Sequence, residues 1–133
     1  MVKRHSYRMP GFIQKALIAT GSVTEEKDWR DLFPARKWSV SHAETLQEAV
    51  RLAEHENFDI VVFTHDLPDC NPIPDKVPPF LQQVRQKSPG AEIIGTGGDP
   101  DQRTALMKSG CPVVVGPLSI ITTLHETIEE LTI

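Results

Sequence analysis

Ile60-Val61-Val62-Phe63 is a run of four apolar residues, and it is the stretch of the sequence that most constrains the fold. A run this short and this apolar suits a β-strand that is covered on both faces, as strands are in a parallel sheet. Four further short apolar runs are expected to form strands, two before it and two after it: residues 16–19, 38–40, 93–94 and 113–115.

Segments with helical periodicity separate these runs. One apolar stripe predicts the second helix: Leu46, Ala49, Val50 and Ala53. Thr45 and Glu48 stand where a capping box would start that helix. A similar stripe predicts the last helix: Ile121, Leu124, Ile128 and Leu131. A short first helix is expected from about residue 25 to residue 33, where Pro34 ends it.

The third helix follows a proline-dense segment, residues 66–79, which contains five prolines. Phe80, Leu81 and Val84 mark the helix, and Pro79 suits a first helical turn, so we expect the helix to begin at about Pro79. The sequence Ser88-Pro89-Gly90 then ends it. The segment 66–79 is either a stiff recognition surface or only a stiffened connection, and the sequence favours neither.

Strand and helix alternate five times, which predicts a single α/β domain with an open parallel sheet. Right-handed crossovers leave few topologies, and we expect a flavodoxin-like (βα)5 three-layer sandwich with strand order 2-1-3-4-5. In such sheets the functional crevice lies beyond the carboxyl ends of the strands. The residues at those ends are Thr20-Gly21, Thr64-His65-Asp66, Thr96-Gly97-Gly98 and Gly116-Pro117.

Length and composition limit the class of protein. A chain of 133 residues has room for one domain, which we place at residues 15–133 behind a basic, flexible arm at residues 1–14. The net charge of −4 gives no reason to expect nucleic acid as a partner. No stretch approaches the ~20 apolar residues of a membrane helix, so we expect a cytoplasmic protein without a membrane partner. Cys70 and Cys111 are isolated, which indicates neither a disulfide nor a zinc site.

Several short motifs, in this order and spacing, resemble the receiver domain of bacterial response regulators of the chemotaxis type. Asp59-Ile60-Val61-Val62-Phe63-Thr64, followed by Pro68, is similar to the third strand of that family, and Ile93-Ile94-Gly95-Thr96 is similar to the fourth. Glu48-Ala49-Val50 resembles a motif of the second helix. Three more positions fit the last part of the family pattern: Ala105, Gly110 and Pro117. The resemblance covers the chain from about residue 15 to its end and implies a two-component signalling domain.

The resemblance also implies that the phosphorylation chemistry of the family is lost. A working receiver holds Mg²⁺ with two acidic residues, accepts phosphate on an aspartate, and uses a hydroxyl and a lysine to position and neutralise it. The corresponding positions are Thr20 and Gly21 for the acidic pair, Thr64 for the acceptor, Thr96 for the hydroxyl and Gly116 for the lysine. We therefore expect a degenerate pseudo-receiver with no metal, no cofactor and no enzymatic activity, which signals without phosphorylation.

Receivers contact their partners through the face formed by the fourth helix, the fifth strand and the fifth helix. Carried onto this chain, that face comprises Gln102, Arg103, Leu106, Met107, Ser119, Thr122 and Thr123. We expect a protein partner or an output domain to bind there, or a homodimer to form through it. This would suit the N-terminal regulatory domain of a larger regulator.

Two other classes of function stay open. One is a flavodoxin-like sensor of a small molecule or nucleotide, because residues 20–24 and 96–99 are glycine-containing loops between a strand and a helix, where backbone N–H groups favour phosphate. Tight turns alone explain these glycines, and we favour that explanation. The other is an enzyme on the same frame that uses His65 and Asp66, although a lone pair of this kind in a loop is more often a solvated turn.

Overall fold

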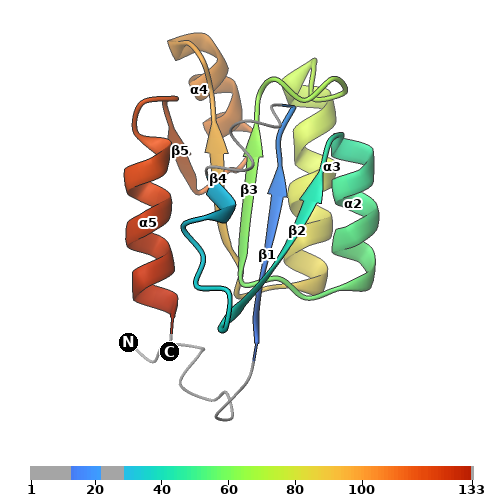
Figure 1. Ribbon diagram of the computed structural model, residues 1–133. Helices are drawn as coiled ribbons and strands as arrows, with labels where there is room; N and C mark the ends of the chain where they lie inside the picture. The colour runs from blue at the N-terminus through green and yellow to red at the C-terminus, as the bar shows by residue number, and fades with distance from the viewer. Residues whose placement is uncertain (1–12, 22–28, 133) are drawn as a thin grey trace.

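The sheet has the predicted topology. The computed structural model describes residues 13–21 and 29–132, in which five strands form one sheet with the order β2-β1-β3-β4-β5 (Figure 1). The strands are β1 (Gln14–Ala19), β2 (Trp38–Ala43), β3 (Ile60–Thr64), β4 (Glu92–Thr96) and β5 (Val113–Val115). Every pair of neighbouring strands is parallel. β1 begins at Gln14, the last residue of the predicted arm, whose residues 1–12 lie outside the described residues.

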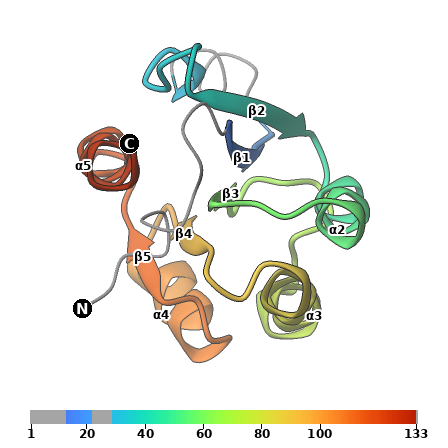
Figure 2. The ribbon, with the colours of Figure 1, turned by 90° about the horizontal axis from the view of Figure 1, so that it is seen from below.

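Helices cover both faces of the sheet, which gives three layers (Figure 2). α2 (Leu46–His55), α3 (Ile73–Lys87) and α4 (Pro100–Lys108) lie on one face, and α5 (Ile120–Leu131) lies on the other. Of the predicted first helix, residues 25–28 lie outside the described residues, Trp29 and Arg30 are helical, and residues 31–33 form a turn. Within the described ranges, none of the helices is long and apolar enough to cross a membrane.

Alternate residues of the strands feed two separate cores, as expected for a sheet that is covered on both sides. On β3, Val61 and Phe63 pack with α2, α3 and α4, while Ile60 and Val62 pack with α5 and with Trp29. β3 is therefore buried on both faces, as its continuous apolar sequence predicts.

The helix α3 begins at Ile73, whereas the sequence predicted a start at about Pro79. The prediction was wrong because it treated each proline as a helix breaker. Pro74 is tolerated in the first turn, where an N–H group has no partner within the helix. Pro78 and Pro79 lie inside the helix, where each removes one hydrogen bond. Burial of one face offsets that loss: Ile73, Val77, Phe80, Leu81 and Val84.

The apolar stripe of α5 differs from the prediction at one position. Ile120 is buried together with Leu124, Ile128 and Leu131, whereas Ile121 is 41% exposed. A rotation of about 100° per residue carries Ile121 away from the sheet when Ile120 faces it. Ile121 is therefore a surface residue.

Two side chains cap the start of α2, whose predicted N-cap is confirmed. The hydroxyl of Thr45 accepts a hydrogen bond from the N–H of Glu48 at 3.0 Å. The carboxylate of Asp69 accepts from the N–H groups of Leu46 (2.6 Å) and Gln47 (2.9 Å). Asp69 lies between β3 and α3, so this cap ties that segment to the beginning of α2.

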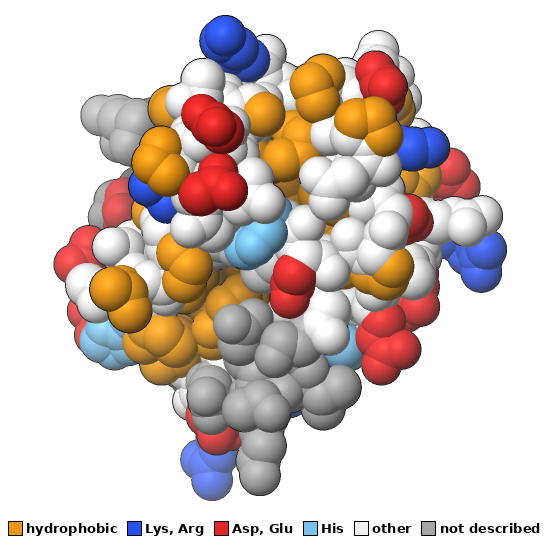
Figure 3. All heavy atoms as spheres, turned by 90° about the horizontal axis from the view of Figure 1, so that it is seen from above, with side chains coloured by type: hydrophobic (Ala, Val, Ile, Leu, Met, Phe, Trp, Pro, Cys, Tyr) orange, Lys and Arg blue, Asp and Glu red, His pale blue; other side chains and the backbone are white. Residues whose placement is uncertain are grey.

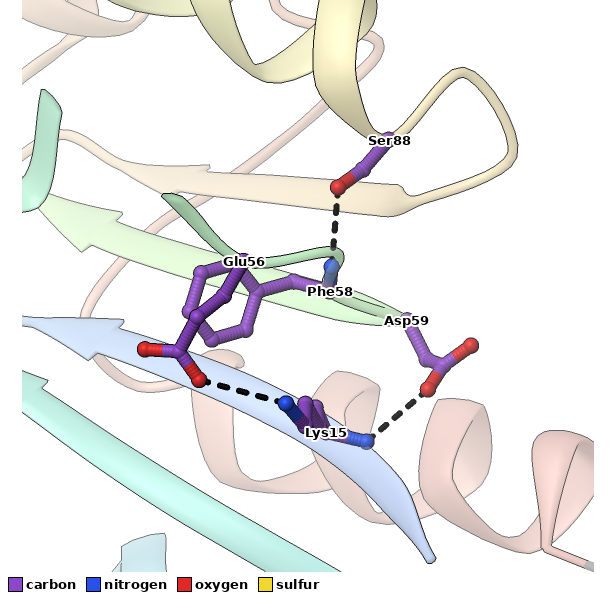
Figure 4. Close-up of polar contacts among 5 residues, drawn as sticks. All are labelled: Lys15, Glu56, Phe58, Asp59 and Ser88. Carbon is purple, nitrogen blue, oxygen red and sulfur yellow. Dashed lines mark hydrogen bonds and ion pairs between the residues drawn. The ribbon is translucent and has the colours of Figure 1, made fainter. Parts of the chain in front are cut away.

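Asp59 ties together the amino ends of β1, β3 and β4 (Figure 4). Its buried carboxylate accepts a hydrogen bond from the backbone N–H of Lys15 (2.8 Å), and its own N–H donates to the Lys15 carbonyl (2.7 Å). The Asp59 carbonyl accepts from the N–H of Glu92 at the start of β4 (2.9 Å). Nearby, the N–H of Phe58 donates to the hydroxyl of Ser88 (2.8 Å). These bonds fix the strand register at the edge of the sheet opposite the predicted site.

Candidate functional site

Three of the predicted site residues gather at the carboxyl edge of the sheet, the edge where the strands end. Thr64 and Thr96 end the neighbouring strands β3 and β4 at the same register position, and Thr20 follows β1, which pairs with β3. All three threonines are buried, at 0–3% exposure. Figure 3 views this edge: acidic side chains and a histidine lie near its centre, and Lys and Arg side chains lie mostly toward its margin.

Gly21 lies against the backbone of Asp66. A Cβ atom on Gly21 would stand 2.8 Å from the Asp66 carbonyl oxygen, which is too close for a side chain. The Asp66 carboxylate turns back and accepts a hydrogen bond from the hydroxyl of Thr64. The loop after β3 therefore fills the space beside Gly21, and any other residue there requires the Asp66 backbone to move.

The guanidinium of Arg103 lies beside Gly116. Its Nη1 donates to the carbonyl of Gly97 at 3.2 Å and lies 3.5 Å from the point where a Cβ atom on Gly116 would stand. Arg103 is half-buried and reaches this point from α4. The resemblance to receivers placed Arg103 on the partner face, whereas in the structure its guanidinium is directed to the carboxyl edge of the sheet. No motif in the sequence indicates this contact.

Gln102, another predicted partner residue, caps its own helix. Its side-chain oxygen accepts from the N–H groups of Gly98 (2.8 Å) and Asp99 (3.1 Å), and its N–H donates to the Asp99 carboxylate (2.8 Å). The spacing Asp99-x-x-Gln102 is a capping-box signature, so this contact was predictable from the sequence. The bonded N–H groups are not available to a phosphate, which weakens the small-molecule sensor as an alternative.

His65 holds the same loop from the other side. Its backbone N–H donates to the Thr96 carbonyl at 3.1 Å, and its Nδ1 lies 3.3 Å from the same oxygen. A Cβ atom on Gly98 would stand 2.8 Å from His65 Nε2, so the ring packs on that glycine. In the described part of the chain, no group of three His, Cys, Asp or Glu side chains is placed to hold a metal ion.

The predicted partner face is exposed only in part. Leu106 is fully buried in the core beneath α4, so its assignment to the face was wrong: its side chain packs inside the domain and presents nothing to a partner. Met107 is 56% exposed. Ser119 and Thr122 are exposed, and Thr123 is half-buried.

Two further apolar residues add to this face. Leu118, between β5 and α5, is 98% exposed, and Ile121 on α5 is 41% exposed. Among the described residues, Met107, Leu118 and Ile121 are three of the four large hydrophobic residues exposed to solvent. Three of the exposed apolar side chains therefore lie on α4, on α5 and in the loop that precedes α5.

Both cysteines are free and buried. Burial raises the pKa of the Cys70 thiol to about 11, with a further contribution from the negative charges of Asp69 and Asp66. Burial also raises the pKa of the Cys111 thiol to about 11, although its backbone hydrogen bonds at Val113 and Gly95 and the charge of Arg85 oppose the shift. Both thiols are therefore protonated at neutral pH and are poor nucleophiles.

The comparisons with known proteins identify the fold. No protein-family model and no curated protein matches the chain. A co-crystal structure of the histidine phosphotransfer signalling protein Ypd1 with the receiver domain of Ssk1, from Saccharomyces cerevisiae, matches with a TM-score of 0.71 and 15% identity, over 93% of this chain and 92% of that chain.

Two further solved structures agree with that match. The chemotaxis response regulator CheY4 of Vibrio cholerae has a TM-score of 0.69 and 16% identity, over 90% of this chain and 98% of that one. The beryllofluoride-activated receiver domain dimer of NtrC4 has a TM-score of 0.65 and 17% identity, over 89% and 98% of the two chains. The chain therefore has the flavodoxin-like fold of response-regulator receiver domains, and identities this low establish the fold alone.

Proposed function

We propose that the chain is a receiver-like signalling module that binds a protein partner without being phosphorylated. One observation carries the proposal: hydroxyls and glycines stand at the carboxyl edge where phosphoryl transfer needs carboxylates and a lysine. Thr20 and Gly21 replace the acidic pair, Thr64 replaces the acceptor and Gly116 replaces the lysine. The receiver domains among the structurally similar proteins support a signalling role. We also propose that the domain is cytoplasmic and has no enzymatic activity.

The residues at the carboxyl edge do not fit the Mg²⁺ ion that receiver chemistry uses. Magnesium prefers hard oxygen ligands, usually with at least one carboxylate. Asp66 supplies the carboxylate beside Thr64, but it accepts the hydrogen bond of the Thr64 hydroxyl, and its backbone fills the space at Gly21. The Thr64 hydroxyl is buried and would give a stable ester in place of a reactive acyl phosphate.

Beryllofluoride and Mg²⁺ together are therefore expected to leave the protein unchanged. The phosphoryl analogue needs a carboxylate acceptor and a bound metal, and Thr64 and Gly21 provide neither. The measurement is the amide NMR spectrum with and without both reagents, alongside a receiver domain that keeps its acidic residues as a positive control. Shift changes clustered at Thr20, Thr64 and Thr96 would contradict the proposal.

A partner face on α4, β5 and α5 is the second part of the proposal. Its support is the exposed apolar set Met107, Leu118 and Ile121, which lie on or next to the elements that form this face, since exposed apolar residues favour association. Two of the matched structures are a complex with a phosphotransfer protein and a receiver dimer. By analogy, we propose that this face binds an output domain, another protein or a second copy of the chain.

Met107→Arg is expected to weaken self-association about tenfold, because it places an unpaired charge in an apolar contact. The wild-type protein is expected to show a weak monomer–dimer equilibrium, in the micromolar range typical of small interfaces. Sedimentation velocity over a range of concentrations measures both. Gln86→Arg, which adds the same charge at an exposed position of α3, is the matched control and should sediment like wild type. Identical sedimentation of Met107→Arg and Gln86→Arg would rule out self-association through this face.

A further inference from the structure

A groove lies between α3 and α4, and its lining residues have no part in the proposed receiver-like role. Its cavity measures about 370 Å³. The two helices lie next to each other on one side of the sheet (Figure 2). The α3 wall is formed by Pro74 and Pro78, and the α4 wall includes Asp101, Thr104, Lys108 and Ser109.

The α3 wall presents a backbone carbonyl without its helical partner. In a helix the carbonyl of residue 74 accepts from the N–H of residue 78, but Pro78 has no N–H. Pro74 and Pro78 are one turn apart on the same helix face, and the Pro74 carbonyl lies between these two lining residues. An acceptor in this position gains from a ligand that donates a hydrogen bond.

The α4 wall adds negative charge at the same end of the groove. Asp101 is the second residue of α4 and Pro74 is the second residue of α3, and both helices start at the carboxyl edge of the sheet. Asp101 is exposed, and the hydroxyl side chain of Thr104 follows it one turn later. Lys108, the other charged residue of the lining, lies seven residues beyond Asp101, or about 10 Å along the helix, so Asp101 is the nearer charge where the helices begin.

We propose that this groove binds an arginine side chain of a partner protein. A guanidinium group is planar, always charged and carries five donors, so one edge can pair with the Asp101 carboxylate while another donates to the Pro74 carbonyl. Its weakly hydrated faces suit contact with the rings of Pro74 and Pro78. An ammonium group offers neither the flat face nor the fork, so lysine fits this site less well.

The site is separate from the face that carries Met107, Leu118 and Ile121. Arginine binding is therefore expected to be the same in Met107→Arg as in wild type. Failure of the arginine site and failure of the proposed partner face are thus distinguishable.

The first test titrates the ¹⁵N-labelled protein with N-acetyl-arginine amide and follows the amide resonances. Saturable shifts are expected at residues 101–109 and at Val77, with a Kd on the order of 1–10 mM for this small probe. N-acetyl-lysine amide is expected to bind at least about fivefold more weakly, and the uncharged citrulline analogue is not expected to saturate. Equal binding of arginine and lysine, or shifts spread over all acidic surfaces, would overturn the proposal.

The second test separates the groove wall from general effects on α3. Pro78→Ala restores an N–H that bonds to the Pro74 carbonyl and also removes the Pro78 ring from the wall, so it should weaken arginine binding about tenfold. Pro79→Ala is the matched control: it restores the next helical bond, to the Asp75 carbonyl, and neither residue lines the groove. Binding by Pro79→Ala should stay within about twofold of wild type. Equal affinities of Pro78→Ala and Pro79→Ala would overturn the assignment, and circular dichroism shows that both are folded.

Discussion

Replacing Leu106 with arginine is expected to unfold the domain. Leu106 is 0% exposed and belongs to the core that α2, α3 and α4 form with the sheet. A guanidinium at that position would be buried without a counter-charge, at a cost of about 4 kcal/mol or more. A domain of this size is stabilised by about 5–15 kcal/mol in total, so a large part of that stability, or all of it, would be lost. Far-UV circular dichroism and a denaturant titration measure the effect.

Met107→Arg is the matched control for this prediction. It makes the same chemical change at the adjacent residue, whose side chain is 56% exposed. Its free energy of unfolding should therefore stay within about 0.5 kcal/mol of wild type. A Leu106→Arg protein that unfolds at the same denaturant concentration as Met107→Arg would mean that α4 faces the sheet with a different side.

The sequence could not decide between these two neighbours. α4 has a single buried residue, so no apolar stripe marks the side that faces the sheet. Leu106 and Met107 were both placed on the partner face by analogy with a family. Consecutive helical residues point about 100° apart, however, so two neighbours rarely share one narrow face.

The strands were predictable because burial on both faces leaves a continuous apolar sequence. All five predicted runs fall within strands, and their order follows from the alternation with helices. The start of α3 was not predictable from the prolines alone, because the buried face of Ile73 and Val77 offsets the hydrogen bonds that Pro78 and Pro79 remove. Propensity fails there because tertiary packing outweighs it.

The candidate site was predictable in its positions but not in its contacts. Residues at strand ends can be placed once the strands are known, which brought Thr20, Thr64 and Thr96 to one edge. The contact of Arg103 with Gly116 joins α4 to the end of β5, and its existence depends on the course of a loop and on one long side chain. Sequence spacing carries no information about such a contact.

Asp59→Ala is expected to lower the free energy of unfolding by about 2 kcal/mol. The family pattern matched Asp59 only as the first residue of the third-strand motif, but its carboxylate is buried and accepts from the Lys15 N–H at 2.8 Å. Alanine removes that charged acceptor, so the Lys15 N–H at the amino edge loses its partner. The loss should appear as a lower denaturant midpoint with an unchanged slope, because the folded domain stays compact.

Two controls separate this bond from the charge around it. Asp59→Asn keeps a side-chain oxygen that can accept from the Lys15 N–H, so it should lose about half as much stability as alanine. Glu56→Gln breaks the nearby ion pair between Glu56 and the Lys15 ammonium (3.3 Å), whose side chains are 34% and 44% exposed. Exposed pairs contribute less than about 1 kcal/mol, so this variant should resemble wild type. If Asp59→Ala were no less stable than Glu56→Gln, the backbone bonds between β1, β3 and β4 would hold the amino edge without the carboxylate.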